Sequence, residues 1–115
     1  MQKYLDRFHQ LLDFSIKSQA SDLHISVGHP PVMRVSGGLF PMIKEEKITP
    51  EISEGLAFSL MSEEQKERFL QEKSVDFSYN LRGEARFRIN VFYQRNTISI
   101  ALRLIPMEIK TIQEL

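Results

Sequence analysis

The sequence predicts a single α+β domain, in which helices pack on an antiparallel sheet. Apolar residues recur every three or four positions over residues 4–18, as in an amphipathic helix. Apolar and polar residues alternate over residues 22–27 and again over residues 85–105, as in half-buried strands. One helix, two or three strands, two helices and three strands follow each other along the chain. This order is typical of antiparallel α+β domains.

The composition limits the class of protein. A chain of 115 residues has the size of one domain and can bury a core without disulfides or metals. Its 15 basic and 15 acidic residues cancel, so no bulk charge attracts nucleic acid, and we expect no nucleic-acid partner. Cysteine is absent, and no stretch has the apolar character of a signal peptide or of a membrane span. We therefore expect a soluble, cytoplasmic protein.

The N-terminal half is expected to hold one helix and two or three short strands. The apolar stripe of the helix consists of Leu5, Phe8, Leu12 and Ile16. Strands are predicted at residues 22–27, 32–35 and 39–43. Pro30-Pro31 separates the first two strands because proline cannot donate to a ladder, and Gly37-Gly38 is a strong turn signal before the third.

Two helices follow, and each has a recognisable start. Thr49 is a favourable N-cap and Pro50 suits the first helical position. The second helix opens with a capping box that pairs Ser62 with Gln65. We expect Phe69 and Leu70 to form its buried side.

The last two strands, over residues 85–94 and 97–105, carry the strongest inference. If their turn is centred on Arg95-Asn96, all cross-strand pairs on one face are apolar. These pairs are Phe87–Leu104, Ile89–Leu102, Val91–Ile100 and Tyr93–Ile98. A shift by one residue would set Arg88 beside a leucine, so the pattern favours this register.

In that register, Arg88 lies directly opposite Arg103 on the other face of the hairpin. Like charges in this position destabilise a ladder unless an anion or a carboxylate lies between them. Arginine suits phosphate because its planar guanidinium binds two oxygens and stays protonated. Two interpretations remain open from the residues alone: a phosphate site, or two arginines that are simply solvated.

Several short motifs, in order along the chain, resemble one known family. They are Ser21-Asp22-Leu23-His24, Gly28-x-Pro30-Pro31-x-x-Arg34-Val35-x-Gly37, Asp76-Phe77-Ser78, Arg86-Phe87-Arg88-Ile89-Asn90 and Arg103-Leu104-Ile105-Pro106. Over residues 4–115, the chain resembles the N-terminal domain of type IV pilus retraction ATPases, the PilT-type twitching motors of the type II and type IV secretion ATPase superfamily.

The resemblance implies a PAS-like domain over residues 1–106, followed at 107–115 by the start of a linker to a RecA-like motor domain. It implies that Arg88 and Arg103 contact the phosphates of ATP, with Arg86 as a further candidate. It also implies a homo-hexamer with ATP and Mg²⁺ in the full-length protein, at the inner-membrane pilus machinery. The chain has no G-x-x-x-x-G-K-[ST] loop, so we expect no ATP hydrolysis and no tightly bound cofactor from it alone.

Other interpretations stay open. The chain is alternatively a stand-alone PAS-like sensor, a structural adaptor, or the equivalent domain of a pilus assembly or type II secretion ATPase. The apolar sheet face favours a packed core over a sensor cavity. His24 has only Asp22 near it as a second metal ligand, so we expect no metal site. Arg86 is otherwise expected to pair with Asp76 or Glu84.

Overall fold

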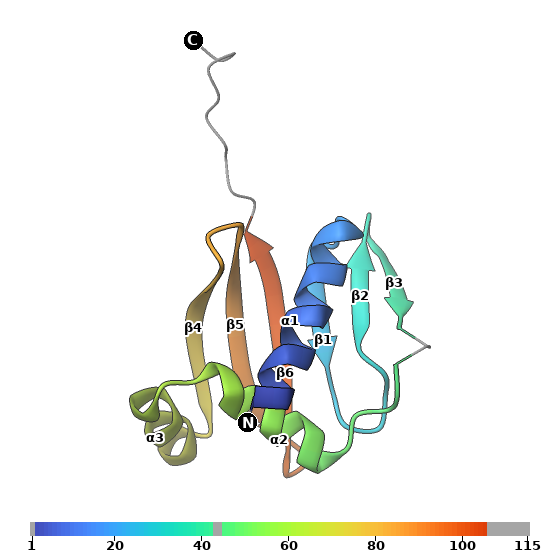
Figure 1. Ribbon diagram of the computed structural model, residues 1–115. Coiled ribbons are helices and arrows are strands. Elements are labelled where there is room, and N and C mark those ends of the chain that lie inside the picture. The colour runs from blue at the N-terminus through green and yellow to red at the C-terminus, as the bar shows by residue number, and fades with distance from the viewer. Residues whose placement is uncertain (1, 43–44, 106–115) are drawn as a thin grey trace.

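The computed structural model describes residues 2–42 and 45–105, which form a six-stranded sheet and three helices (Figure 1). In chain order the elements are α1 (Gln2–Lys17), β1 (Asp22–Ile25), β2 (Val32–Val35), β3 (Gly38–Pro41), α2 (Pro50–Leu60), α3 (Glu63–Glu72), β4 (Ser74–Leu81), β5 (Ala85–Gln94) and β6 (Thr97–Ile105). The strand order is β3-β2-β1-β6-β5-β4, with antiparallel neighbours throughout. The predicted α+β class is confirmed. The expected domain boundary at residue 106 and the linker at 107–115 lie outside the described residues.

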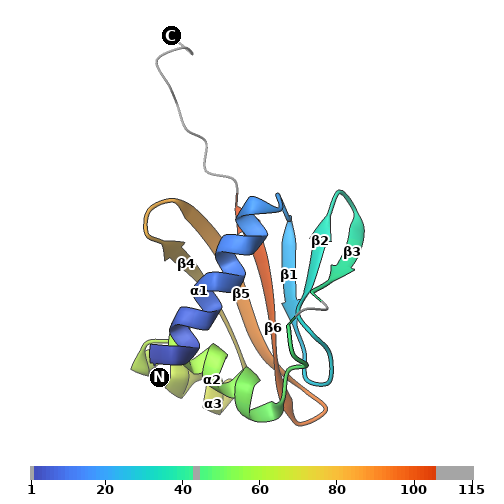
Figure 2. The same ribbon diagram turned by 45° about the vertical axis from the view of Figure 1, so that its right-hand side comes forward.

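Helix α1 crosses one face of the sheet, with α2 and α3 near its N-terminal end (Figures 1 and 2). Its buried side includes Phe8 and Leu12, as predicted, and also Leu11 and Ser15. Below it, the core between helices and sheet includes the fully buried Leu23, Ile25, Ile48, Leu56, Phe69, Leu81, Phe87, Ile89, Ile100 and Leu102. No helix in the described part of the chain is long and apolar enough to cross a membrane.

The starts of α2 and α3 agree with the sequence. The Thr49 side chain accepts a hydrogen bond from the backbone N–H of Ile52, at 3.1 Å. Ser62 and Gln65 form the reciprocal capping box, with bonds of 2.9 and 3.2 Å. Both helices therefore begin where their orphan N–H groups find side-chain acceptors.

The prediction that Leu70 belongs to the buried side of α3 is wrong. Leu70 is 47% exposed, whereas Phe69 is fully buried. The Phe69 ring stacks on Tyr93 of β5, with centroids 5.0 Å apart, and meets Phe58 of α2 edge-on. Successive residues on a helix point about 100° apart, so only one of these two neighbours faces the sheet.

The β5–β6 hairpin has the predicted register. Phe87 faces Leu104 and Arg88 faces Arg103. The turn residues Arg95 and Asn96 both have positive φ, 54° and 66°, as a two-residue hairpin turn of matching twist requires. The hairpin turn and the alternating pattern therefore both place the same side chains on the face away from the core.

Strand β1 lies between β2 and β6, near the middle of the sheet. It is shorter than predicted, because it ends at Ile25 and Val27 forms only an isolated parallel bridge with Ile48. The register places Asp22 opposite Arg34 on one side and opposite Arg103 on the other. The long-range pairing of β1 with β6 thus brings the first strand of the chain to the last.

Candidate functional site

Charged side chains form a row across the sheet face that the helices leave uncovered. In the order of the strands, the row contains Arg34 on β2, Asp22 on β1, Arg103 on β6 and Arg88 on β5, each opposite the next. We call these four residues the arginine row. Leu23, Leu102 and Ile89 point the other way and are buried under the helices, because successive strand residues face opposite sides.

The two arginines predicted to contact phosphate are adjacent but differ in their surroundings. Arg103 donates from Nε to Oδ1 of Asp22 at 3.3 Å, and its side chain is 76% exposed. Arg88 is exposed and has no hydrogen-bond or ion-pair partner within residues 2–42 and 45–105. The carboxylate of Asp22 therefore pairs with Arg103 and does not neutralise the positive charge of Arg88.

Arg86 lies on the same face as Arg88, two residues away along β5, and is exposed. The alternative prediction of an ion pair with Asp76 or Glu84 is wrong, because neither carboxylate contacts Arg86 in the structure, and Glu84 pairs with Arg82 at 3.1 Å. The hydrogen bonds that Arg82 donates to the carboxylates of Asp13 and Glu84 raise the pKa of Arg82 above its usual value, with Asp13 making the larger contribution. Arg86 thus remains available to extend the basic surface around Arg88.

The histidines show no arrangement for metal or catalysis in the part of the chain that the structure describes. His24 is exposed beside Ala101, and the described residues contain no group of three or more His, Cys, Asp or Glu side chains that could hold a metal ion. His9 hydrogen-bonds the hydroxyl of Tyr79 at 2.6 Å and joins α1 to β4. Burial raises the pKa of Tyr79, although the positive charge of Arg82 opposes this shift.

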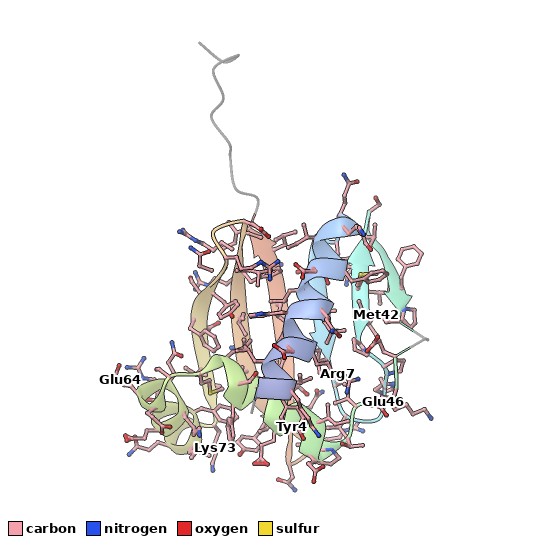
Figure 3. The ribbon with its side chains drawn as sticks, viewed as in Figure 1. Tyr4, Arg7, Met42, Glu46, Glu64 and Lys73 are labelled. Atoms are coloured by element: carbon pink, nitrogen blue, oxygen red, sulfur yellow. The ribbon has the colours of Figure 1, made fainter. Side chains whose placement is uncertain are left out.

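A separate apolar groove lies on the helix side of the sheet. It has a volume of about 510 Å³ between α1 and the β2–β3 hairpin, and Phe14, Met33 and Met42 are among its lining residues. Its Arg7 forms ion pairs with Glu45 and Glu46, and Figure 3 shows Arg7 near Glu46. Phe14 lies outside the apolar stripe predicted for α1, and its side chain is half exposed.

Comparison with known proteins places these features in a family, although no protein-family profile matches the chain. The type IV pilus ATPase PilU of Pseudomonas aeruginosa is 36% identical over 108 residues, which cover 94% of this chain and 28% of PilU. The type IV pilus retraction ATPase PilT of the same organism is 36% identical over 110 residues, covering 92% of this chain and 30% of PilT. A crystal structure of the retraction motor PilT with bound ADP matches 93% of this chain and 31% of its own, with a TM-score of 0.81 and 38% identity.

The chain is an N-terminal domain of the PilT-type ATPase family. This PilT-type domain spans less than a third of the length of the relatives that it matches. The structure of the ATPase DotB from Legionella pneumophila also covers 86% of it, with a TM-score of 0.69. At 24% identity, that likeness shows a shared fold.

Proposed function

We propose that this PilT-type domain is the nucleotide-sensing part of an ATP-driven motor that retracts type IV pili. In this proposal, Arg88 and Arg103 contact the phosphates of ATP, and Arg86 lies within reach of the same site. The nucleotide is bound mainly by a RecA-like motor domain of the same or an adjacent subunit, in a hexamer at the cytoplasmic side of the inner membrane. The equivalent domain of a pilus assembly or secretion ATPase is the nearest alternative.

One observation carries the proposal: Arg88 and Arg103 face each other on an exposed sheet surface, and within residues 2–42 and 45–105 no carboxylate pairs with both of them. Natural sheets avoid directly opposed like charges, because the pair lowers stability. This chain nevertheless has two directly opposed arginines. It is related to PilT, which has been crystallised with ADP. An anion between the two guanidinium groups would convert the repulsion into attraction.

The chemistry of the row suits phosphate groups. A guanidinium offers five N–H donors, of which Arg103 uses its Nε–H on Asp22, while Arg88 has no partner in the described part of the chain. Charge-assisted bonds from arginine to phosphate are among the strongest hydrogen bonds in proteins. For Mg²⁺ the described residues offer no cluster of ligands, so we assign the metal to the motor domain and not to this surface.

Bound ATP would supply the phosphoryl group whose hydrolysis drives the motor. The residues of this domain would orient that group and stabilise negative charge on its oxygens. Because Arg88 and Arg103 project from paired strands, they would approach the nucleotide as one rigid unit. Contact with the phosphates would therefore couple the nucleotide state to the position of the whole domain.

The test is ATP turnover by the protein that joins this domain to a motor domain. An arginine that stabilises a phosphoryl transition state contributes roughly 10³-fold or more, so R88M and R103M should each lower kcat by more than about tenfold. The matched control is R95M, which removes the same charge at the hairpin tip and should leave kcat within about twofold. Unchanged kcat in R88M and R103M would reject the phosphate role.

A structural adaptor is the second candidate, and the exposed apolar side chains favour it. Phe14 and Phe40 are 50% and 52% exposed, and Phe14 lines the apolar groove between α1 and the β2–β3 hairpin. An exposed apolar groove commonly marks a contact with another protein. An adaptor would need this helix-side surface and would tolerate loss of Arg88. The same turnover assay separates the two candidates. If the domain is an adaptor, F14S should lower turnover by impairing assembly, whereas R88M should leave turnover unchanged.

A further inference from the structure

We propose that Asp22 is a positioning residue for the arginine row. It holds the Nε edge of Arg103 so that the two terminal nitrogens of this guanidinium stay available, beside Arg88, for a phosphate group. The inference rests on the proposed function, because the orientation of Arg103 matters only if Arg103 binds phosphate.

Asp22 is the most enclosed member of the row. Its side chain is 15% exposed, compared with 43% for Arg34 and 76% for Arg103. Oδ2 accepts a hydrogen bond from the Ser21 hydroxyl at 2.8 Å and lies 3.9 Å from Nε of Arg34. Oδ1 accepts from Arg103. Both carboxylate oxygens are therefore occupied, and the carboxylate is a fixed point on the sheet.

The contact with Arg103 uses a single nitrogen. Nε lies 3.3 Å from Oδ1, and Nη1 and Nη2 of Arg103 make no contact of their own with the described residues. A guanidinium binds a phosphate through two parallel N–H groups, and the edge formed by Nη1 and Nη2 can still supply them. Side-on tethering to Asp22 thus restrains the arginine and does not consume its phosphate-binding edge.

Restraint matters because Arg103 is long and mostly exposed. An unrestrained arginine loses substantial rotamer freedom when it binds a ligand, and prior ordering removes part of that cost. Arg88, directly opposite on β5, has no such tether in the described part of the chain. The row therefore combines one pre-oriented arginine with one that adapts to the bound anion.

Asp22 also carries a negative charge close to the proposed phosphate site, and this charge alone would weaken anion binding. Positioning and simple charge repulsion thus predict opposite effects when Asp22 is removed. Asp76 provides a matched control. It is exposed on β4, on the same face of the sheet and opposite Asn90, and it has no partner in the described residues.

The experiment is a titration of this chain with sodium pyrophosphate, followed by the ¹H–¹⁵N NMR signals of the backbone and of the Arg103 Nε–H group. We expect D22A to weaken binding about fivefold, the cost of ordering one long side chain. D22N should stay within about twofold of the parent, since the Asn oxygen still accepts from Nε. D76A should bind slightly more tightly than the parent.

Equal or tighter binding by D22A, in parallel with D76A, would overturn the proposal. If D22A does not fold, D22E decides, because it keeps the charge but moves the carboxylate by one methylene. Weaker binding by D22E supports positioning, and unchanged binding overturns it. The R103M variant tests the proposed function separately from the role of Asp22. If R103M binds pyrophosphate as tightly as the parent, Arg103 is not a phosphate ligand, and the phosphate contact of the proposed function is rejected as well.

Discussion

The opposed pair of Arg88 and Arg103 predicts a measurable cost in stability. The two residues face each other across β5 and β6; among the described residues, Arg103 pairs with Asp22 and Arg88 has no carboxylate partner. Replacing Arg88 by Gln should therefore stabilise the isolated chain. Replacing Arg103 by Gln should change stability little, because the relief of repulsion is offset by loss of the Asp22 ion pair.

The magnitude follows from Coulomb's law. With guanidinium groups splayed to about 8 Å and an effective dielectric constant of about 40 to 80, the repulsion is roughly 0.5–1 kcal/mol. This agrees with the scale of about 0.2–1 kcal/mol for cross-strand pairs. An exposed ion pair such as Asp22–Arg103 contributes about 0–1 kcal/mol, of similar size and opposite sign.

The assay is a double-mutant cycle on R88Q and R103Q, with the free energy of unfolding measured in urea. At low salt, the cycle should show a repulsive coupling of about 0.5–1 kcal/mol that vanishes near 1 M NaCl, where the screening length is about 3 Å. A coupling of zero at low salt, or one that salt does not change, would refute the reasoning. Pyrophosphate should raise the melting temperature of the parent but not of the double variant.

Three further predictions concern the fold. F69A should lower the free energy of unfolding by about 3–5 kcal/mol, as for other truncations of buried aromatic side chains. L70A, which truncates the exposed neighbouring side chain, should lower it by less than about 0.5 kcal/mol in the same urea titration. S62A should cost about 1 kcal/mol through loss of the α3 cap, visible as faster amide exchange in that helix. Burial raises the pKa of Tyr79 above 10.0, so the unfolded chain loses this proton first. Stability should thus be complete below about pH 10 and fall above it, and Y79F should flatten that fall in urea midpoints.

The sequence predicted the register of the last hairpin because a period of two is strict. A shift by one residue would move Phe87 or Leu104 away from the core side, and the turn at Arg95-Asn96 selects among the alignments that differ by two residues. The structure has the predicted alignment. The sequence also predicted the N-caps of α2 and α3 at Thr49 and Ser62, because an N-cap depends on residues only three positions apart. These features are local, or depend on a turn of two residues.

The remaining features depend on contacts between distant segments, which no local pattern encodes. The pairing of β1 with β6 brings Asp22 to Arg103, although these two strands lie near opposite ends of the chain. The exposure of Phe14 and Leu70 depends on how far α1 and α3 cover the sheet. A ten-residue helix with two adjacent apolar residues does not reveal which of them faces inward.

The left-handed turn at Arg95-Asn96 has a consequence for how such domains change length in evolution. Side chains alternate between the two faces, so one residue added within β5 or β6 would move Arg88 or Arg103 into the core and their apolar neighbours into water. Insertions or deletions within β5 or β6 should therefore involve two residues at a time, so that Arg88 and Arg103 stay on the exposed face of the sheet. Loops outside the hairpin carry no such parity rule, and insertions should accumulate in them instead.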